Sequence, residues 1–158
     1  MKLAERKKIS AQEFGLRSMG ALEGIALTGK ILAVLIATAV ILSIALSALA
    51  VNDTEKVGFA IQKVLLAAPL LLVYLSIARV FAEEFFFRAF LVPRIGALGS
   101  SLVFGISHFA YGSAAEVLGA SVLGYVLAVF YRDNRALVPN FIAHVLYNFF
   151  VLALIFYA

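Results

Sequence analysis

Two carboxylates and a guanidinium interrupt a strongly apolar part of the sequence. The stretch AEEFFFRAF, residues 82–90, places Glu83, Glu84 and Arg88 among aromatic and aliphatic side chains. On insertion scales, a charged side chain at the centre of a membrane helix costs about 2.5 to 3.5 kcal/mol. Charges in such surroundings therefore either pair with one another or serve a site. A carboxylate in a site can take a proton from water, which is the first step of hydrolysis.

Two histidines and an amide occur at helical spacing in later apolar segments. The stretch FGISH ends in His108, and HVLYN places His144 and Asn148 four residues apart on one helical face. Carboxylate and imidazole groups can activate water, while imidazole and amide N–H groups can stabilise a developing oxyanion. Together these residue types favour hydrolysis of an amide bond.

A purely structural interpretation of the charges is also open. Arg79 with Glu83, and Glu84 with Arg88, are spaced i, i+4 on one helix, so the cluster can neutralise itself. A histidine or an asparagine in a membrane helix is often an interhelical hydrogen-bonding group.

Depth along the helices favours a single site instead. With a rise of about 1.5 Å per residue, Glu83, His108, His144 and Asn148 lie about 10 to 16 Å from their expected helix ends at 93, 100 and 137. Three helices thus bring polar groups to a similar level. We expect one water-containing cavity that opens to the cytoplasm.

The composition requires a membrane to position these groups. Of the 158 residues, 64% are hydrophobic and 14% are charged, far from the values of soluble domains. The chain has no cysteine, which excludes disulfides, thiol catalysis and cysteine-ligated metals. The net charge of +4 comes from basic residues at segment ends, which indicates topology and not a nucleic-acid partner.

The predicted fold class is an all-α, polytopic membrane bundle of about five membrane-embedded helices. The uncharged run 31–51 is long enough to span the hydrocarbon core. Four further helices are expected: one from near Lys63 to Pro93 with a kink at Pro69, a half-helix over 101–111, one over 114–131, and one from Pro139 to the end. A glycine-rich turn is expected at 94–99, and Gly119 and Gly124 are expected to allow close helix packing.

The chain divides into a polar arm, residues 1–30, and a single membrane-embedded helical catalytic domain, residues 31–158. Phe14, Met19, Leu22 and Ile25 recur at roughly helical spacing, which indicates an interfacial helix in the arm. By the positive-inside rule, the N-terminus and the opening of the site face the cytoplasm, and the C-terminus lies on the opposite side.

The three motifs EEFFFR, FGISH and HVLYN, in this order, resemble the motifs EExxxR, FxxxH and HxxxN of the CPBP intramembrane proteases. This family includes type II CAAX prenyl endopeptidases, Abi proteins, and bacteriocin-processing or immunity relatives. The resemblance covers roughly residues 64–150. It implies an integral protein of a prokaryotic cell membrane that cleaves a membrane protein or peptide within or beside the lipid bilayer.

The resemblance also implies a role for each motif residue. It assigns Glu83 as the catalytic glutamate, His108 as the histidine that helps to activate water, His144 and Asn148 as the oxyanion pair, and Glu84 and Arg88 as supporting residues. We expect Arg88 to keep Glu84 ionised. We expect Arg79 to point away from Glu83, because an ion pair would weaken that carboxylate as a base.

Other chemistries and functions stay open at this point. Glu83, His108 and His144 could hold zinc and leave a position for water. The sequence lacks HExxH, however, so a mechanism without a cofactor is favoured. The alternative functions are a non-catalytic membrane immunity or scaffolding protein of the same fold and, less favoured because no internal repeat is visible, a small proton-coupled transporter.

Overall fold

The structure is a computed structural model that describes residues 10–51 and 53–157, with the side chains of residues 156 and 157 left aside. The first nine residues of the predicted polar arm, with its basic residues Lys2, Arg6, Lys7 and Lys8, lie outside the described residues. Within the described ranges the chain forms helices and no strand. The predicted all-α membrane bundle is confirmed.

Three helices are long and apolar enough to cross a membrane, judged by length and composition. They are α1 (Ala21–Ala48), α6 (Ala114–Asn134) and α7 (Leu137–Tyr157), the last through its stretch Leu137–Ile155. The predicted span 31–51 is therefore part of a longer helix that begins inside the range assigned to the polar arm. Glu23 lies in the first turn of α1, where the helix dipole favours an acidic side chain. The division of the chain at residue 30 stays a prediction.

The predicted interfacial helix in the arm does not form as one element. A short 3-10 helix, η1 (Ala11–Phe14), ends at Gly15, which has a left-handed backbone with φ 75°. Residues 16–20 then run without helical structure until α1 begins. The spacing of apolar side chains was helical, but the left-handed turn at Gly15 interrupts it.

The second predicted helix is divided at Ala68, where the sequence predicted a kink. Ala68 has φ −156° and ψ 74°, and it separates α2 (Glu55–Ala67) from Pro69. A proline disfavours helical geometry at the preceding residue and lacks an N–H group, so the chain turns sharply here.

Beyond Ala68 the helical path carries the first motif. It runs through four consecutive segments, which are α3 (Pro69–Tyr74), η2 (Leu75–Arg79), α4 (Val80–Glu83) and η3 (Glu84–Leu91). The segments η2 and η3 are π-helical, a wider form that is frequent at functional sites. Glu83 and Glu84 thus occupy the junction between an α-helical turn and a π-helical segment.

The next helix, α5 (Val92–Ser107), contains the predicted glycine turn. Gly96 has φ 75° and ψ 172°, a conformation that residues with a side chain rarely adopt, and it bends the chain by interrupting the helix. The helix ends at His108, and a 3-10 turn, η4 (Phe109–Tyr111), leads into α6. The third helix is short, as predicted.

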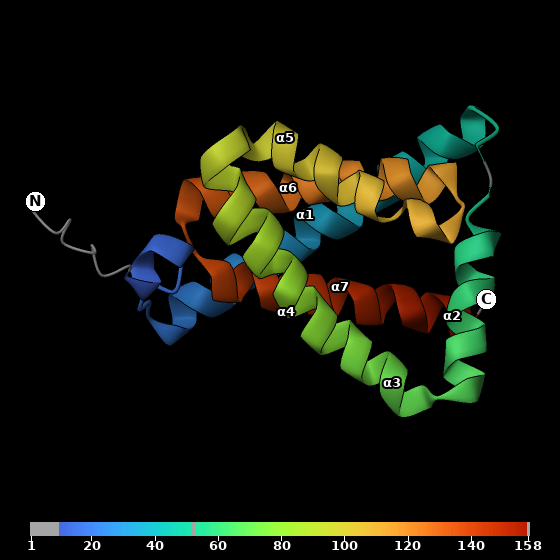
Figure 1. The fold of residues 1–158 in the computed structure, drawn as a ribbon, viewed down its shortest axis with the longest axis horizontal. Helices are drawn as coiled ribbons and strands as arrows, with labels where there is room; N and C mark the ends of the chain where they lie inside the picture. Colours follow the sequence, from blue (N-terminus) through green and yellow to red (C-terminus); the bar gives the residue numbers. More distant parts are fainter. Residues whose placement is uncertain (1–9, 52, 158) are drawn as a thin grey trace, which may run out of the picture.

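The helices pack so that α5 lies against α6, and α1 lies against both α6 and α7 (Figure 1). The segment α3–η3 crosses this group obliquely. A Cβ atom on Gly124 would fall 2.6 Å from Cδ1 of Phe104, so the predicted close packing holds there. At Gly119 the nearest atom is Leu42 Cδ2 at 4.0 Å, so this glycine does not mediate a close approach.

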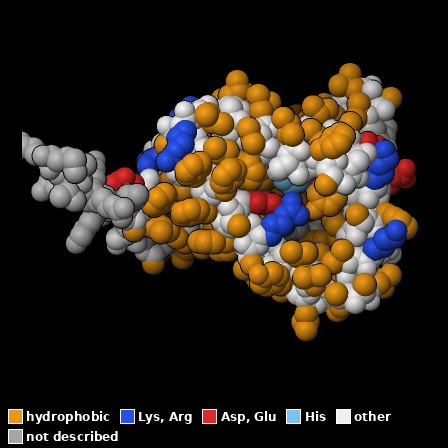
Figure 2. All heavy atoms as spheres, viewed as in Figure 1, with side chains coloured by type: hydrophobic (Ala, Val, Ile, Leu, Met, Phe, Trp, Pro, Cys, Tyr) orange, Lys and Arg blue, Asp and Glu red, His pale blue; other side chains and the backbone are white. Residues whose placement is uncertain are grey.

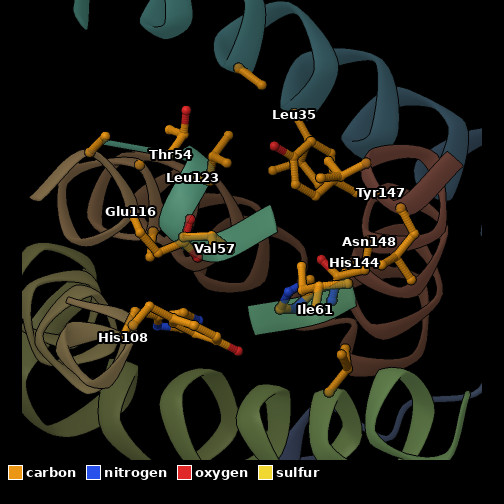
Figure 3. A pocket seen from close by; sticks show the side chains of 18 of the residues that line it. Leu35, Thr54, Val57, Ile61, His108, Glu116, Leu123, His144, Tyr147 and Asn148 are labelled. Atoms are coloured by element: carbon orange, nitrogen blue, oxygen red, sulfur yellow. The ribbon is translucent and has the colours of Figure 1, made fainter. Parts of the chain in front are cut away.

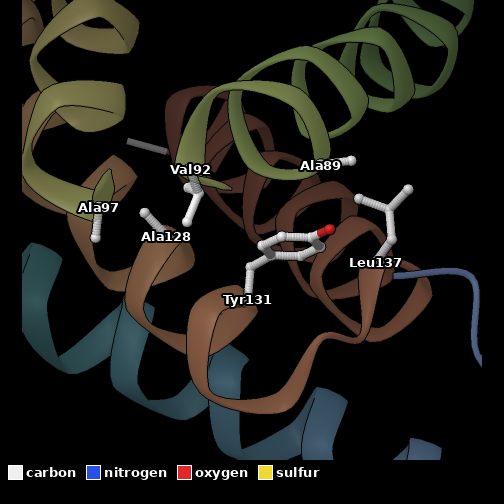
Figure 4. Close-up of a cluster of buried hydrophobic side chains, with 6 residues drawn as sticks. All are labelled: Ala89, Val92, Ala97, Ala128, Tyr131 and Leu137. Atoms are coloured by element: carbon white, nitrogen blue, oxygen red, sulfur yellow. The ribbon is translucent and has the colours of Figure 1, made fainter. Parts of the chain in front are cut away.

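One end of the bundle is filled by a hydrophobic cluster (Figure 4). Its buried members are Ala89, Val92, Ala97, Ala128, Tyr131 and Leu137. Phe14 packs against it from the N-terminal segment, and the backbone amide of Leu137 donates to Gly15 at 2.9 Å. Arg135 Nη2 also donates to the carbonyl of Glu13 at 2.7 Å. The N-terminal segment therefore covers this end.

Hydrophobic side chains cover most of the face shown in Figure 2, which fits a lipid environment. In the middle of the same face is a hollow, in which acidic, basic and histidine side chains are visible together. Lipid-facing helices thus surround a polar interior.

Candidate active site

A cavity of about 430 Å³ lies within the bundle, between α1, α2, the η2–α4 segment, α5, α6 and α7. Glu83, His108, His144 and Asn148 all line it, so the structure brings the four predicted catalytic side chains together. In Figure 3, His108 lies on one side of the cavity and His144 and Asn148 lie on the other. The three motifs thus meet from three different helical segments.

Behind the cavity wall, Glu84 connects η3 to α7. Its side chain has no exposure, and its Oε1 atom lies 2.8 Å from Nδ1 of His144. Asn140 Nδ2 is 3.5 Å from Oε2 of the same carboxylate and 2.8 Å from the carbonyl of Leu127. Because a carboxylate only accepts, His144 carries a proton on Nδ1 and Nε2 is left for the cavity.

Arg88 is the buried counter-ion of this carboxylate. Its Nη1 atom lies 3.3 Å from Glu84 Oε1, and its side chain is 1% exposed. The guanidinium also lies over the ring of Phe104, with Cζ 4.3 Å from the centroid, and Nη2 is 3.4 Å from the carbonyl of Gly124. Arg88 therefore joins η3 to α5 and α6.

Glu83 is paired with Arg79, contrary to our expectation that Arg79 points away. Arg79 Nε donates to Glu83 Oε1 at 2.7 Å, and Nη1 donates to the hydroxyl of Tyr111 at 2.9 Å. The expectation failed because the i, i+4 spacing brings the two side chains together, and Tyr111 holds the guanidinium in place. Both ion pairs of the structural interpretation therefore form, yet Glu83 still faces the cavity.

The ring of His108 is fixed by the helix that carries it. Nδ1 lies 2.9 Å from the carbonyl oxygen of Phe104, one turn earlier, and the ring packs edge-on against the ring of Phe104 with centroids 4.7 Å apart. A carbonyl oxygen only accepts, so the proton of the neutral ring is on Nδ1. The lone pair of Nε2 is then free to accept a proton.

Sequence reasoning missed several polar residues of the site. Asn140 lies one turn before His144 on α7, so the i, i+4 series could have revealed it. Glu116 and Tyr111 line the cavity from α6 and η4. Neither belongs to a motif, and only the fold places them beside His108.

The cavity extends away from the N-terminal end of the bundle. Its lining includes Val51, Thr54 and Tyr111, which belong to the end where α1 meets α2 and α5 meets α6 (Figure 1). The expectation that the N-terminus and the opening of the site share one side stays a prediction. The hydrophobic cluster of Figure 4 fills the N-terminal end of the bundle.

The three residues that could hold zinc are Glu83, His108 and His144. Glu83, His108 and His144 share the cavity, but in the part of the chain that the structure describes no three His, Cys, Asp or Glu side chains are grouped closely enough to hold a metal ion. The residues present do not fit a zinc centre in this conformation.

Fold and site together define a class: a helical membrane protein with a polar cavity suited to hydrolysis. The pattern of one family, described as type II CAAX prenyl endopeptidase Rce1-like, matches residues 65–150. This match covers more than half of the chain and includes all three motifs, so the chain belongs to that family of CAAX-type intramembrane endopeptidases. No curated protein and no solved structure matches the chain.

Proposed function

We propose that this protein is an intramembrane endopeptidase in which Glu83 and His108 activate water and His144 and Asn148 stabilise the oxyanion. The observation that carries this proposal is the convergence of these four side chains on one cavity, although they come from α4, α5 and α7. A bundle with so few charged residues has no packing reason to gather acid, imidazole and amide groups around a cavity.

The fixed orientation of both histidines supports the division of roles. His108 has a free lone pair on Nε2, which suits it to take a proton from water together with Glu83. His144 can donate from Nε2 only when the ring carries both protons, and the buried carboxylate of Glu84 supplies the negative charge that such an imidazolium needs. The amide of Asn148, one turn along the same face, can supply a second donor.

The surroundings of the cavity support a membrane-associated substrate. Hydrophobic side chains surround the hollow on the face in Figure 2, so an extended peptide can approach from the lipid without crossing a polar surface. We therefore propose a membrane protein or a lipid-attached peptide as the substrate, with the scissile bond placed at the level of Glu83.

The test is the Glu83→Gln variant, with Glu55→Gln as the matched control. Glu55 is an exposed carboxylate in the first turn of α2 and does not line the cavity. Membrane peptides from cells that carry each form are compared by mass spectrometry. We expect fragments that depend on the native protein to disappear with Glu83→Gln and to persist with Glu55→Gln, while both variants stay folded and inserted. Cleavage that survives Glu83→Gln would remove the proposed base.

The same variants separate the alternative functions. A scaffolding or immunity protein would show no Glu83-dependent fragments at all. A proton-coupled transporter would lose ion flux in liposomes with Glu83→Gln and leave the peptides unchanged.

The proposed mechanism uses no metal ion. We therefore expect activity to persist after exhaustive chelation, and elemental analysis of the purified protein to find no stoichiometric zinc. Loss of activity on chelation, with recovery on adding zinc, would instead support a metal-dependent variant.

A further inference from the structure

A third carboxylate faces the cavity, and the mechanism above does not use it. Glu116 lies in the first turn of α6 and lines the cavity with His108. Figure 3 shows the two side chains on the same side of the cavity, across from His144 and Asn148.

Glu116 differs from the other two carboxylates near the cavity because it has no arginine partner in the described part of the chain. Glu83 is paired with Arg79 at 2.7 Å, and Glu84 with Arg88 at 3.3 Å. Within residues 10–51 and 53–157, no lysine or arginine forms an ion pair with Glu116. A carboxylate in a partly buried cavity is unfavourable unless a positive charge or a proton compensates it.

His108 is the imidazole that lacks an acidic partner of its own. The Nδ1 atom of His144 contacts the carboxylate of Glu84, whereas that of His108 contacts two neutral groups, the backbone carbonyl of Phe104 at 2.9 Å and the hydroxyl of Ser107 at 3.3 Å. A backbone carbonyl orients the ring but carries no full charge to balance an imidazolium. Glu116, which has no cationic partner among the described residues, therefore lies on the same side of the cavity as His108, which has no acidic partner among them.

We propose that Glu116 is a positioning residue that stabilises the protonated form of His108 during peptide-bond hydrolysis. This inference rests on the proposed function. The role is electrostatic, because Glu116 acts through His108 and does not exchange a proton with the substrate.

The proton moves as follows in this scheme. Nε2 of His108 takes a proton from the attacking water, and the water oxygen forms a bond with the carbonyl carbon of the substrate. When the carbon–nitrogen bond breaks, the same proton passes from Nε2 to the departing amine nitrogen. The products are one carboxylic acid and one amine, and His108 returns to its neutral form.

Several other groups face this pair and belong to the electrostatic environment of the proton. From the surrounding elements they are Arg79 on η2, Glu83 on α4, Tyr111 on η4, and His144 and Tyr147 on α7. The ring of Tyr111 is stacked on that of His108 with centroids 6.1 Å apart. Among these neighbours, the carboxylate of Glu83 and the guanidinium of Arg79 are paired with each other.

The test compares the variants Glu116→Gln and Glu116→Asp with Glu83→Gln and with the control Glu55→Gln. Each is assayed as the full chain in liposomes. The substrate is a peptide identified by the comparison of membrane fragments described under the proposed function. For Glu116→Gln we expect kcat to fall about 10- to 100-fold with KM changed less than about threefold. The loss of activity at acid pH, where His108 is already protonated and cannot take a proton from water, should begin about one pH unit lower, because the imidazolium is no longer stabilised. Glu116→Asp should recover part of kcat.

The outcomes separate this inference from the proposed function. An inactive Glu83→Gln beside a Glu116→Gln variant with native kcat and pH profile would overturn only the role of Glu116. A rise in KM for substrates with basic side chains, at unchanged kcat, would overturn it in favour of substrate binding.

A second measurement, which does not depend on enzymatic activity, distinguishes the proposed effect from misfolding of the variant. In protein with isotope-labelled histidine, Glu116→Gln should reduce the protonated fraction of His108 at a given pH and leave His144 unchanged, as observed by NMR. Equal changes in both histidines, or in neither, would contradict the proposal.

Discussion

Nδ1 of His144 lies 2.8 Å from Oε1 of Glu84, a carboxylate with no exposure to solvent, although the two residues are 60 positions apart in the chain. This contact joins the first motif to the third. Since Arg88 lies 3.3 Å from the same oxygen, one buried carboxylate fixes both a cation on its own helix and an imidazole on another. Glu84, the second glutamate of the motif, therefore positions His144 from outside the cavity lining.

Replacing Glu84 by glutamine should damage stability as well as activity. Glutamine is nearly isosteric but uncharged, so Arg88 would remain buried without its counter-ion and His144 would have a neutral amide in place of a charged acceptor. Breaking a buried ion pair costs about 3 to 5 kcal/mol, so we expect the free energy of unfolding to fall by about that amount. Thermal unfolding in detergent measures the effect, and the exposed Glu55→Gln should change it by less than about 0.5 kcal/mol. Native stability of Glu84→Gln would show that the buried carboxylate is not the counter-ion of Arg88.

Two glycines on α6 provide a matched test of packing near the site. Gly124→Ala should be destabilising by about 1 to 3 kcal/mol and should lower activity, because its Cβ would fall 2.6 Å from the Phe104 ring, on which Arg88 and His108 pack. Gly119→Ala meets only Leu42 at 4.0 Å and should be neutral or stabilising by up to about 1 kcal/mol. Unfolding and cleavage assays on both variants check this, and equal effects would contradict the close approach at Gly124.

The sequence was sufficient for the features that depend on local pattern. The apolar runs predicted α1, α6 and α7, Gly96 was part of the predicted turn, and Pro69 marked the break after α2. The pairing of Glu84 with Arg88 followed from the i, i+4 spacing. Each of these depends on residues within about one helical turn of one another, or on a single continuous run.

Features that depend on the packing of distant segments were not predictable in this way. The same spacing rule also pairs Arg79 with Glu83, but Tyr111, 32 positions away, completes the contact, and no pattern in the sequence signals it. Glu116 is one acidic residue in the first turn of a helix, a position that a capping preference alone would explain. Only the fold places it in the cavity.

Stability should depend on pH through Asp53, which joins the α1–α2 junction to the start of α6. The Ser113 hydroxyl donates to its carboxylate at 2.7 Å, and the amides of Ala115 and Ala114 donate at 3.0 and 2.8 Å. These hydrogen bonds, that of Ser113 first, lower the pKa of Asp53 below its ordinary value of 3.8. A lowered pKa in the folded state means that the contribution is present above about pH 4 and is lost as the pH falls further.

The measurement is the melting temperature of the native protein and of Asp53→Asn as a function of pH. We expect Asp53→Asn to melt at a lower temperature at pH 7, and the difference to shrink below about pH 4 as the native carboxylate takes up a proton. Asp133→Asn, at an exposed carboxylate near the end of α6, is the control and should leave the melting temperature nearly unchanged. A difference that is constant between pH 7 and pH 3 would contradict the role of the ionised carboxylate.

The placement of the two ends of the bundle can be tested because the chain has no native cysteine. Asp133 lies beside the α6–α7 loop, at the end covered by the N-terminal segment, whereas Lys56 lies at the opposite end and donates to the carbonyl of Gly112. Since basic residues gather near the first of these ends, the positive-inside rule predicts that it faces the cytoplasm. In intact cells, a membrane-impermeant thiol reagent should therefore label Lys56→Cys and should reach Asp133→Cys only after the membrane is permeabilised. The reverse pattern would invert the proposed orientation, and labelling of both from one side would contradict a bundle whose two ends lie on opposite sides of the membrane.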